Sequence, residues 1–269
     1  MIIDFHTHIF PDKIAHSTVS ALAKNASIEP HCDGTMAGLL SQMEESGVDI
    51  SVNLPVLTRP RQYDSVKAFA KELNEKSYKG ARIISFAGVH PDMENALERL
   101  KEIKREGFLG IKIHPDYQDK FIDDDSYVKL LQYAKELDLI TVTHAGLDGA
   151  YVGQPIKCTP KRVMNLLDKI GGYEKLVLAH MGANELFDEV YNTLASANVY
   201  IDTAYVLHSI GRDMFEKILV KHTEDRVLFA TDSPWQHQGK EIEIIKSYKL
   251  GDSVEEKIFS QNARKLLKI

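Results

Sequence analysis

Cysteine is scarce in this sequence of 269 residues, which contains only Cys32 and Cys158. The two lie far apart and form no Cys-x-x-Cys pair, so the sequence predicts neither a disulfide framework nor a thiolate zinc site. A basic excess is also missing, because 33 basic residues face 39 acidic ones and leave a net charge of −6. This balance gives no basic footprint for nucleic acid.

Long apolar runs are absent as well. No run approaches the length that crosses a membrane, and the first residues lack a basic segment followed by an apolar one. No Gly-x-Gly-x-x-Gly motif follows the first apolar segment, and no stretch reads as a linker, a repeat or a low-complexity tract. We therefore expect a cytoplasmic protein with no membrane or nucleic-acid partner, whose residues 1–269 form a single domain. The oligomeric state stays open, with a homodimer as one option.

Short β-branched segments recur along the chain at roughly 30-residue intervals, the size of a βαβ unit, with amphipathic helical patterns between them. Eight repetitions favour an α/β fold, a (β/α)8 TIM barrel that can be distorted, over an open doubly wound sheet. The long connection between Ile9 and Thr35 predicts a loop over the barrel mouth. The expected strands are Ile2–Phe5, Asp49–Leu54, Ile83–Gly88, Leu109–Ile113, Ile140–Thr143, Leu176–Ala179, Val199–Thr203 and Val227–Ala230.

Histidines gather at the C-terminal ends of these expected strands, which is where a barrel of this kind carries its active site. Residues two apart share one face of a strand, so His6 and His8 point the same way, into the barrel if Phe5 and Thr7 face the helices. Such a pair can hold one divalent ion, and imidazole suits Zn²⁺, Mn²⁺, Fe²⁺, Co²⁺ or Ni²⁺. The histidines at or just beyond strand ends are His6, His8, His90, His114, His144 and His180.

Asp232 follows the last expected strand. Leu228, Ala230 and Asp232 share a strand face, and a closed barrel places its last strand beside its first. A single histidine at a strand end is usually structural. The larger set instead indicates one metal-centred site, formed by His6, His8, His144, His180 and Asp232.

Four motifs connect the sequence with a known family: Asp4-Phe5-His6-Thr7-His8, Thr143-His144-Ala145-Gly146, Leu178-Ala179-His180-Met181-Gly182 and Ala230-Thr231-Asp232-Ser233-Pro234. Over its whole length the chain resembles the amidohydrolase superfamily, in the branch of aminocarboxymuconate-semialdehyde decarboxylase-like, TIM-barrel metal-dependent hydrolases. The resemblance implies that the metal is bound by His6, His8, His144 and Asp232. It also implies that His180 is a catalytic base or a further ligand.

The resemblance also bears on the number of metal ions. In other branches of the superfamily, a carboxylated lysine or a glutamate on strand four bridges two ions. Here the fourth expected strand carries Lys112 and His114 facing inward, and it contains no glutamate. We therefore expect one divalent ion, with Zn²⁺ ahead of Mn²⁺, Fe²⁺, Co²⁺ or Ni²⁺. We also expect an uncarboxylated Lys112 that contacts the substrate, with a carboxylated Lys112 as the alternative.

Three imidazoles and one carboxylate leave such an ion positively charged and with an open position, as a catalytic site needs. An ion of this kind lowers the pKa of bound water to about 7. Asp232 and His180 are the expected catalytic residues, because both can handle the proton of that water. The expected reaction is hydrolysis of an amide, ester or lactone in a small molecule. The alternative is decarboxylation of an unsaturated carboxylic acid, and the sequence does not separate the two.

A few side chains predict the class of substrate. Arginine binds carboxylates in a bidentate manner, so Arg59 and Arg61, in the loop after the second strand, predict a carboxylate-bearing substrate. Lys112, His114 and Trp235 complete the set of expected substrate contacts.

Three other functional classes share parts of this pattern. TatD-type DNases share the Gly88-Val89-His90-Pro91 segment, but they carry the strand-four glutamate that is missing here. Deaminases of the superfamily carry a glutamate soon after strand five, where this sequence has Gly146-Leu147-Asp148. A barrel that binds metal without catalysis would have a closed coordination shell and no pocket above it.

Overall fold

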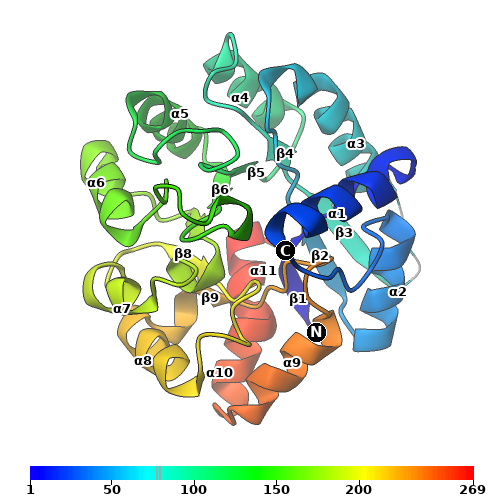
Figure 1. The fold of residues 1–269 in the computed structure, drawn as a ribbon, viewed down its shortest axis with the longest axis vertical. Helices are drawn as coiled ribbons and strands as arrows, with labels where there is room; N and C mark the ends of the chain where they lie inside the picture. Colours follow the sequence, from blue (N-terminus) through cyan, green and yellow to red (C-terminus); the bar gives the residue numbers. More distant parts are fainter. Residues whose placement is uncertain (77, 79) are drawn as a thin grey trace.

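The computed structural model describes residues 1–76, 78 and 80–269, and in it the paired strands run parallel (Figure 1). The first sheet has the order β1-β2-β3 and consists of Ile3–Thr7, Ile50–Asn53 and Arg82–Ser85. The second runs from β4 to β9 in sequence order, and its strands are Ala87–Gly88, Gly110–Ile113, Ile140–Thr143, Leu176–Leu178, Tyr200–Asp202 and Val227–Leu228.

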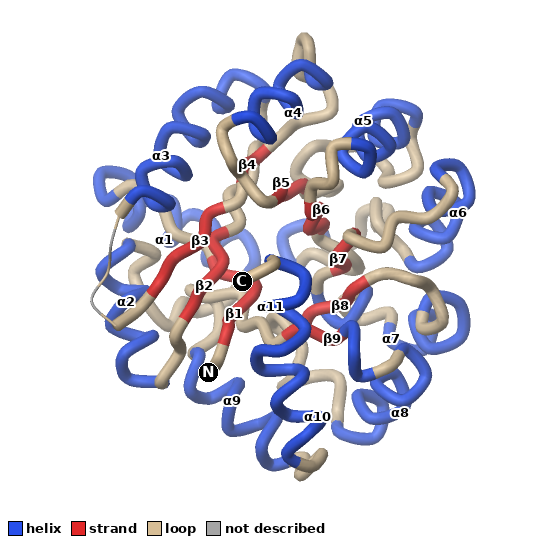
Figure 2. Tube along the Cα trace, turned by 180° about the vertical axis from the view of Figure 1, so that it is seen from behind, coloured by secondary structure: helices blue, strands red, loops and turns tan. Residues whose placement is uncertain are grey.

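Two junctions join these sheets into one ring. β3 and β4 are parts of a single expected strand, interrupted only at Phe86. At the other junction, the backbone N–H of Phe5 donates to the carbonyl of Phe229 over 2.9 Å, and that of Asp232 donates to the carbonyl of His6 over 2.8 Å. The strands therefore surround one axis, and the predicted TIM barrel is confirmed (Figures 1 and 2).

Helices surround this ring of strands (Figure 2). The N-terminus of α6 is fixed as its sequence predicts, because the Thr159 hydroxyl accepts a hydrogen bond from the backbone N–H of Arg162 and Pro160 occupies the first turn. The surrounding helices are α2 (Met36–Ser46), α3 (Tyr63–Glu75), α4 (Ala96–Arg105), α5 (Asp125–Glu136), α6 (Pro160–Ile170), α7 (Phe187–Glu189), α8 (Arg212–His222) and α9 (Gln238–Ser247).

The apolar core has an inner and an outer part. Outside the strands, one cluster packs the helices against the ring. Inside, a second cluster contains Phe5, Val52 and Phe86, and the rings of Phe5 and Phe86 meet edge to face at 6.0 Å. Chain-terminal helices follow at α10 (Asp252–Glu256) and α11 (Asn262–Leu267), and Leu266 joins the inner cluster. α11 therefore covers one end of the barrel (Figure 2), where the sequence analysis assigned no element.

The other end of the barrel lies beneath α1, which spans Asp12–Ala26 and crosses the front of the ring in Figure 1. The connection predicted here as a loop over the mouth therefore lies where expected but is largely helical. The helix forms because Ala15, Val19 and Ala23 recur every four residues and become buried together. No helix in the described part of the chain combines the length and apolar character needed to span a membrane.

Candidate metal centre

A cavity of about 780 Å³ lies at the C-terminal ends of the strands. Every histidine of the predicted site and Asp232 line it, and so do Lys112, His114 and Trp235. Arg59 and Arg61 are exposed and are not among the lining residues. The prediction that these two arginines bind the substrate therefore finds no support in the geometry, since the Thr58–Gln62 turn presents Thr58 and Gln62 to the cavity instead.

The first strand does not follow the simple alternation expected from its sequence. Phe5 packs inside the barrel rather than against the helices, yet His6 also lines the cavity. The pairing of β1 with β2 shifts register between Asp4 and Thr7, which marks a bulge-like irregularity. Such irregularities re-aim side chains, which explains how two consecutive residues both face the interior.

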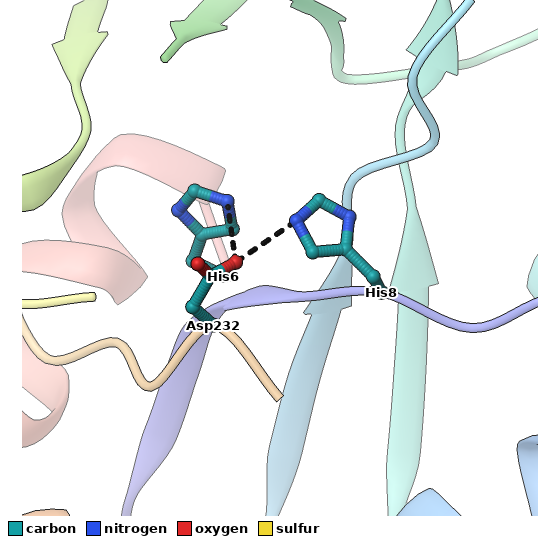
Figure 3. A group of neighbouring side chains, drawn as sticks. All are labelled: His6, His8 and Asp232. Atoms are coloured by element: carbon teal, nitrogen blue, oxygen red, sulfur yellow. Dashed lines mark ion pairs between the residues drawn. The ribbon is translucent and has the colours of Figure 1, made fainter. Parts of the chain in front are cut away.

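His6, His8 and Asp232 place one ligand atom each within 4.8 Å of one another (Figure 3). The Oδ1 atom of Asp232 lies 3.0 Å from Nε2 of His8 and 3.4 Å from Nε2 of His6. On the far side of the rings, Nδ1 of His6 lies 2.9 Å from Oδ2 of Asp202, and Nδ1 of His8 lies 2.8 Å from the carbonyl of Leu54. Each Nδ1 therefore carries the proton, and each Nε2 turns its lone pair toward Asp232.

This donor set fits a divalent metal ion. Burial lowers the pKa of His6 well below its ordinary value, and the nearby Lys112 charge acts in the same direction, so the ring is neutral as a ligand must be. Nζ of Lys112 lies 3.0 Å from Nε2 of His6 and is itself buried. Burial lowers the pKa of Lys112 to about 8.

His180 is held by three contacts. Its backbone N–H donates to Oδ1 of Asp202 over 2.9 Å, and its Nδ1 lies 2.8 Å from the carbonyl of Ala204. Because Nδ1 must donate to that carbonyl, Nε2 carries the lone pair and accepts from Nδ1 of His144 over 3.0 Å. Nε2 of His144 is then a buried acceptor without a partner among the described residues.

His144 enters the same cavity, but its ligand atom groups with those of His114 and Asp148 rather than with Asp232. The rings of His114 and His144 are stacked, 4.2 Å apart and inclined by only 11°. Lone pairs in two parallel ring planes do not converge on one point, so this second group is poorly arranged for an ion. Metal binding by His144 together with His6, His8 and Asp232 stays a prediction.

Two site residues adopt a backbone conformation that costs energy. The φ angles of His180 and Asp232 are +62° and +65°, in the left-handed region that side chains larger than glycine rarely occupy. Strain of this kind persists where the surrounding structure imposes it, and it is concentrated at functional sites. His180 follows β7 and Asp232 follows β9, and the side chains of both residues line the cavity.

Asp202 is the main site residue that the sequence analysis missed. It is fully buried on β8, and its two oxygens contact Nδ1 of His6 and the backbone N–H of His180. Its position within an apolar strand was the available signal, since a buried carboxylate needs partners. Tyr117 was missed as well, and its ring stacks on His114 at 4.0 Å.

A family model described as Amidohydrolase matches residues 3–269, nearly the whole chain. The chain belongs to the amidohydrolase family. The predicted resemblance is thereby confirmed, and so is the prediction of an enzyme. No match to this amidohydrolase was found among curated protein sequences.

Solved structures share the fold of this amidohydrolase at low identity. A 2,6-dihydroxybenzoate decarboxylase from Rhizobium is 18% identical, with a TM-score of 0.69 over 99% of this chain and 98% of that one. A 5-carboxyvanillate decarboxylase from Novosphingobium aromaticivorans, complexed with manganese and 4-hydroxy-3-methoxy-5-nitrobenzoic acid, is 16% identical, with a TM-score of 0.71 over 100% and 96%. A candidate 2-pyrone-4,6-dicarboxylic acid hydrolase from Pseudomonas putida is 14% identical, with a TM-score of 0.67 over 99% and 97%. At these identities the likeness establishes the fold.

Proposed function

We propose that this amidohydrolase is a metal-dependent decarboxylase of a small, planar, unsaturated or aromatic carboxylic acid. The observation that carries the proposal is the position of Lys112, the one lysine or arginine among the described residues that line the cavity. Its Nζ lies 3.0 Å from Nε2 of His6, directly at the metal donors. A carboxylate paired with Lys112 would sit at the reacting centre, as decarboxylation requires. A hydrolase would hold a substrate carboxylate away from the bond it cleaves.

The shape of the cavity wall supports a planar substrate. Tyr117, His114 and His144 form a continuous stack, with ring centroids 4.0 and 4.2 Å apart and planes within 12° of parallel. Trp235 and Tyr205 also line the cavity. Flat conjugated molecules pack well against such rings. The hydroxybenzoate-type substrates in the names of two structural relatives are consistent with this choice.

The residues proposed to hold the metal are His6, His8 and Asp232, with His144 as a fourth ligand. A divalent ion bound there supplies Lewis acidity toward a substrate oxygen. We propose Zn²⁺ or Mn²⁺; manganese is the metal bound in one structural relative. The chain's own contribution is to orient the carboxylate at Lys112 and to exchange a proton through His180. When the carbon–carboxylate bond breaks, carbon dioxide leaves and a proton takes its place on carbon.

Hydrolysis of an amide, ester or lactone is the second candidate. It is favoured by the placement of Asp232 and His180 in one cavity, because this carboxylate and imidazole could take a proton from water. One structural relative is a candidate 2-pyrone-4,6-dicarboxylic acid hydrolase by name.

Product analysis separates the two reactions. Protein loaded with Mn²⁺ or Zn²⁺ is incubated with 2,6-dihydroxybenzoate, 5-carboxyvanillate and 2-pyrone-4,6-dicarboxylate, while carbon dioxide and organic products are quantified. The decarboxylase proposal expects carbon dioxide in equal amount to the decarboxylated ring. A ring-opened acid formed without carbon dioxide would establish the hydrolase instead.

The role of Lys112 is tested in the same assay. Lys112→Met keeps the length of the buried side chain and removes its charge, so KM should rise at least tenfold. Lys217→Met, at an exposed position on α8, is the matched control and should leave KM unchanged. An unaltered KM in Lys112→Met would remove the support for a carboxylate at this position.

A further inference from the structure

Helix α1 presents two different stripes of side chains. Ala15, Val19 and Ala23 form the buried stripe that fixes the helix on the barrel. The adjacent stripe, Ile14, Thr18, Leu22 and Ala26, also recurs every four residues, and all four line the catalytic cavity. Spacing by four places side chains one above another along a helix, so the second stripe is a continuous wall about 18 Å long, at 1.5 Å of rise per residue.

α3 forms a second wall of the same cavity. Val66 and Phe69 lie one turn apart on this helix and line the cavity, as does Val56 in the loop that precedes it. Each of the three is half-buried, as is Leu22 on the α1 side. Apolar side chains that remain partly exposed inside a concave site are typical of a surface that a ligand covers.

Charge is confined to the other end of the cavity. The acidic and basic lining residues are the cavity histidines, Lys112, Asp148, Glu185 and Asp232, which all come from strand ends and the loops that follow them. Within the described residues of α1 and α3, no charged side chain lines the cavity. The cavity therefore has a charged end at the strand termini and an uncharged, largely apolar end between two helices.

Size also argues for a substrate with two parts. At about 780 Å³ the cavity lies in the upper half of the range that holds drug-sized ligands, roughly 300 to 1,000 Å³. A single-ring carboxylic acid fills only part of such a volume, so the cavity has room for a second part of the substrate.

We propose that the substrate carries an uncharged apolar arm, an alkyl or aryl chain, that extends from the reacting ring and lies between α1 and α3. This inference rests on the proposed function, which places the substrate's carboxylate at Lys112. It defines the substrate class as an amphipathic carboxylic acid. Burial of each additional methylene along the walls should improve affinity about threefold to fourfold.

A homologous series tests the arm directly. The metal-loaded protein is titrated calorimetrically with 2,6-dihydroxybenzoate and its 4-methyl, 4-propyl and 4-pentyl homologues. We expect Kd to fall about threefold to fourfold per methylene in the wild type. The dependence should flatten in Leu22→Gln and in Ile14→Gln, and the loss of affinity relative to wild type should grow with the length of the chain. Leu97→Gln is the matched control, because Leu97 is an exposed leucine on α4 outside the cavity.

Carbon dioxide release from the same compounds keeps the two proposals apart. Affinity that rises with chain length without carbon dioxide release supports the arm and contradicts the decarboxylase. Release of carbon dioxide with no dependence of Kd on chain length supports the decarboxylase and contradicts the arm. An equal chain-length dependence in Leu22→Gln, Ile14→Gln and wild type overturns the arm, and failure of every homologue to bind overturns both proposals.

Discussion

The cavity histidines differ in where their lone pairs point, and this difference separates their proposed roles. Nε2 of His6 and of His8 face Asp232, because Nδ1 of each ring is bound on the far side. Nε2 of His180 instead accepts from His144. Identical side chains can therefore serve as metal ligands in one place and in proton transfer in another.

His180→Ala should keep about one metal ion per chain and lose at least two decades of turnover. A positioned general acid or base contributes about 10²- to 10⁴-fold to the rate, while the metal donors stay intact in this variant. Metal content by elemental analysis and turnover by product release are the two measurements. His8→Ala is the comparison and should lose metal and activity together. A metal-free His180→Ala would make His180 a ligand, and a fully active one would leave it with no role.

Glu241→Gln should become more stable relative to wild type as pH rises. Oε2 of Glu241 is buried without a partner among the described residues, and burial, followed by nearby Asp4, raises the pKa of Glu241 to about 8. Between pH 5 and 8 the folded protein holds a proton there that the unfolded chain has lost, so wild-type stability falls as pH rises. The gap should widen by up to about 1.4 kcal/mol per pH unit.

Denaturant unfolding of metal-loaded protein at pH 5.5 and 7.5 measures this gap. Glu243→Gln, at an exposed position on the same helix α9, is the control and should follow the wild type at both values. Equal pH slopes in Glu241→Gln and wild type would show that Glu241 is ionised in the folded protein.

At the scale of secondary-structure elements, small irregularities position the site. The register shift in β1 brings both Phe5 and His6 to the interior, so one strand serves the core and the metal donors. The connection between β1 and β2 contains α1. One stripe of this helix packs on the barrel, and the other forms part of the cavity wall. A regular strand would turn only one of Phe5 and His6 to the interior, and a short loop would provide no helical wall for the cavity.

Thr159→Ala should cost about 1 kcal/mol of stability and leave activity unchanged. Its hydroxyl accepts from the backbone N–H of Arg162 at the start of α6, and loss of such a cap typically costs this amount. The melting temperature should fall by about 2 to 4 °C. Thr193→Ala removes an exposed hydroxyl that makes no N-cap contact and should change stability by less than about 0.5 kcal/mol. A melting temperature unaltered in Thr159→Ala would show that the cap contributes nothing.

At the scale of the whole molecule, the apolar core and the metal centre are separate. Both hydrophobic clusters are complete without the donor residues, so the barrel should stay folded when the metal is removed. Bound metal should still add stability by mass action, about 2.7 kcal/mol at a free concentration 100 times its Kd. Loss of the circular dichroism signal on chelation at room temperature would contradict this separation.

We expect one metal equivalent per chain. The parallel rings of His114 and His144 do not direct their lone pairs to one point, whereas His6, His8 and Asp232 converge. His114→Ala should therefore leave the metal content unchanged by elemental analysis. Two equivalents in the wild type, falling to one in His114→Ala, would establish a second ion at His114.

Strand number and the histidines and aspartate at the centre of the cavity could be predicted from the sequence, because both depend on local patterns. Short apolar segments that alternate with helical patterns predict eight barrel strands. Because barrel strands bring their C-terminal ends together, residues as distant as His6 and Asp232 were expected at one site. The structure places both in one cavity. The composition of the motifs was likewise enough to indicate the family, which the family model confirms.

Only the tertiary structure decided how those residues face one another. The register shift in β1, the support of His6 by Asp202 and the exposure of Arg59 depend on backbone pairing and packing between distant segments, which no local pattern contains. The same is true of α1, because only the folded structure shows that its second stripe lines the same cavity as residues of α3. Residue types thus determined the kind of chemistry, and long-range packing determined which atoms are in position to perform it.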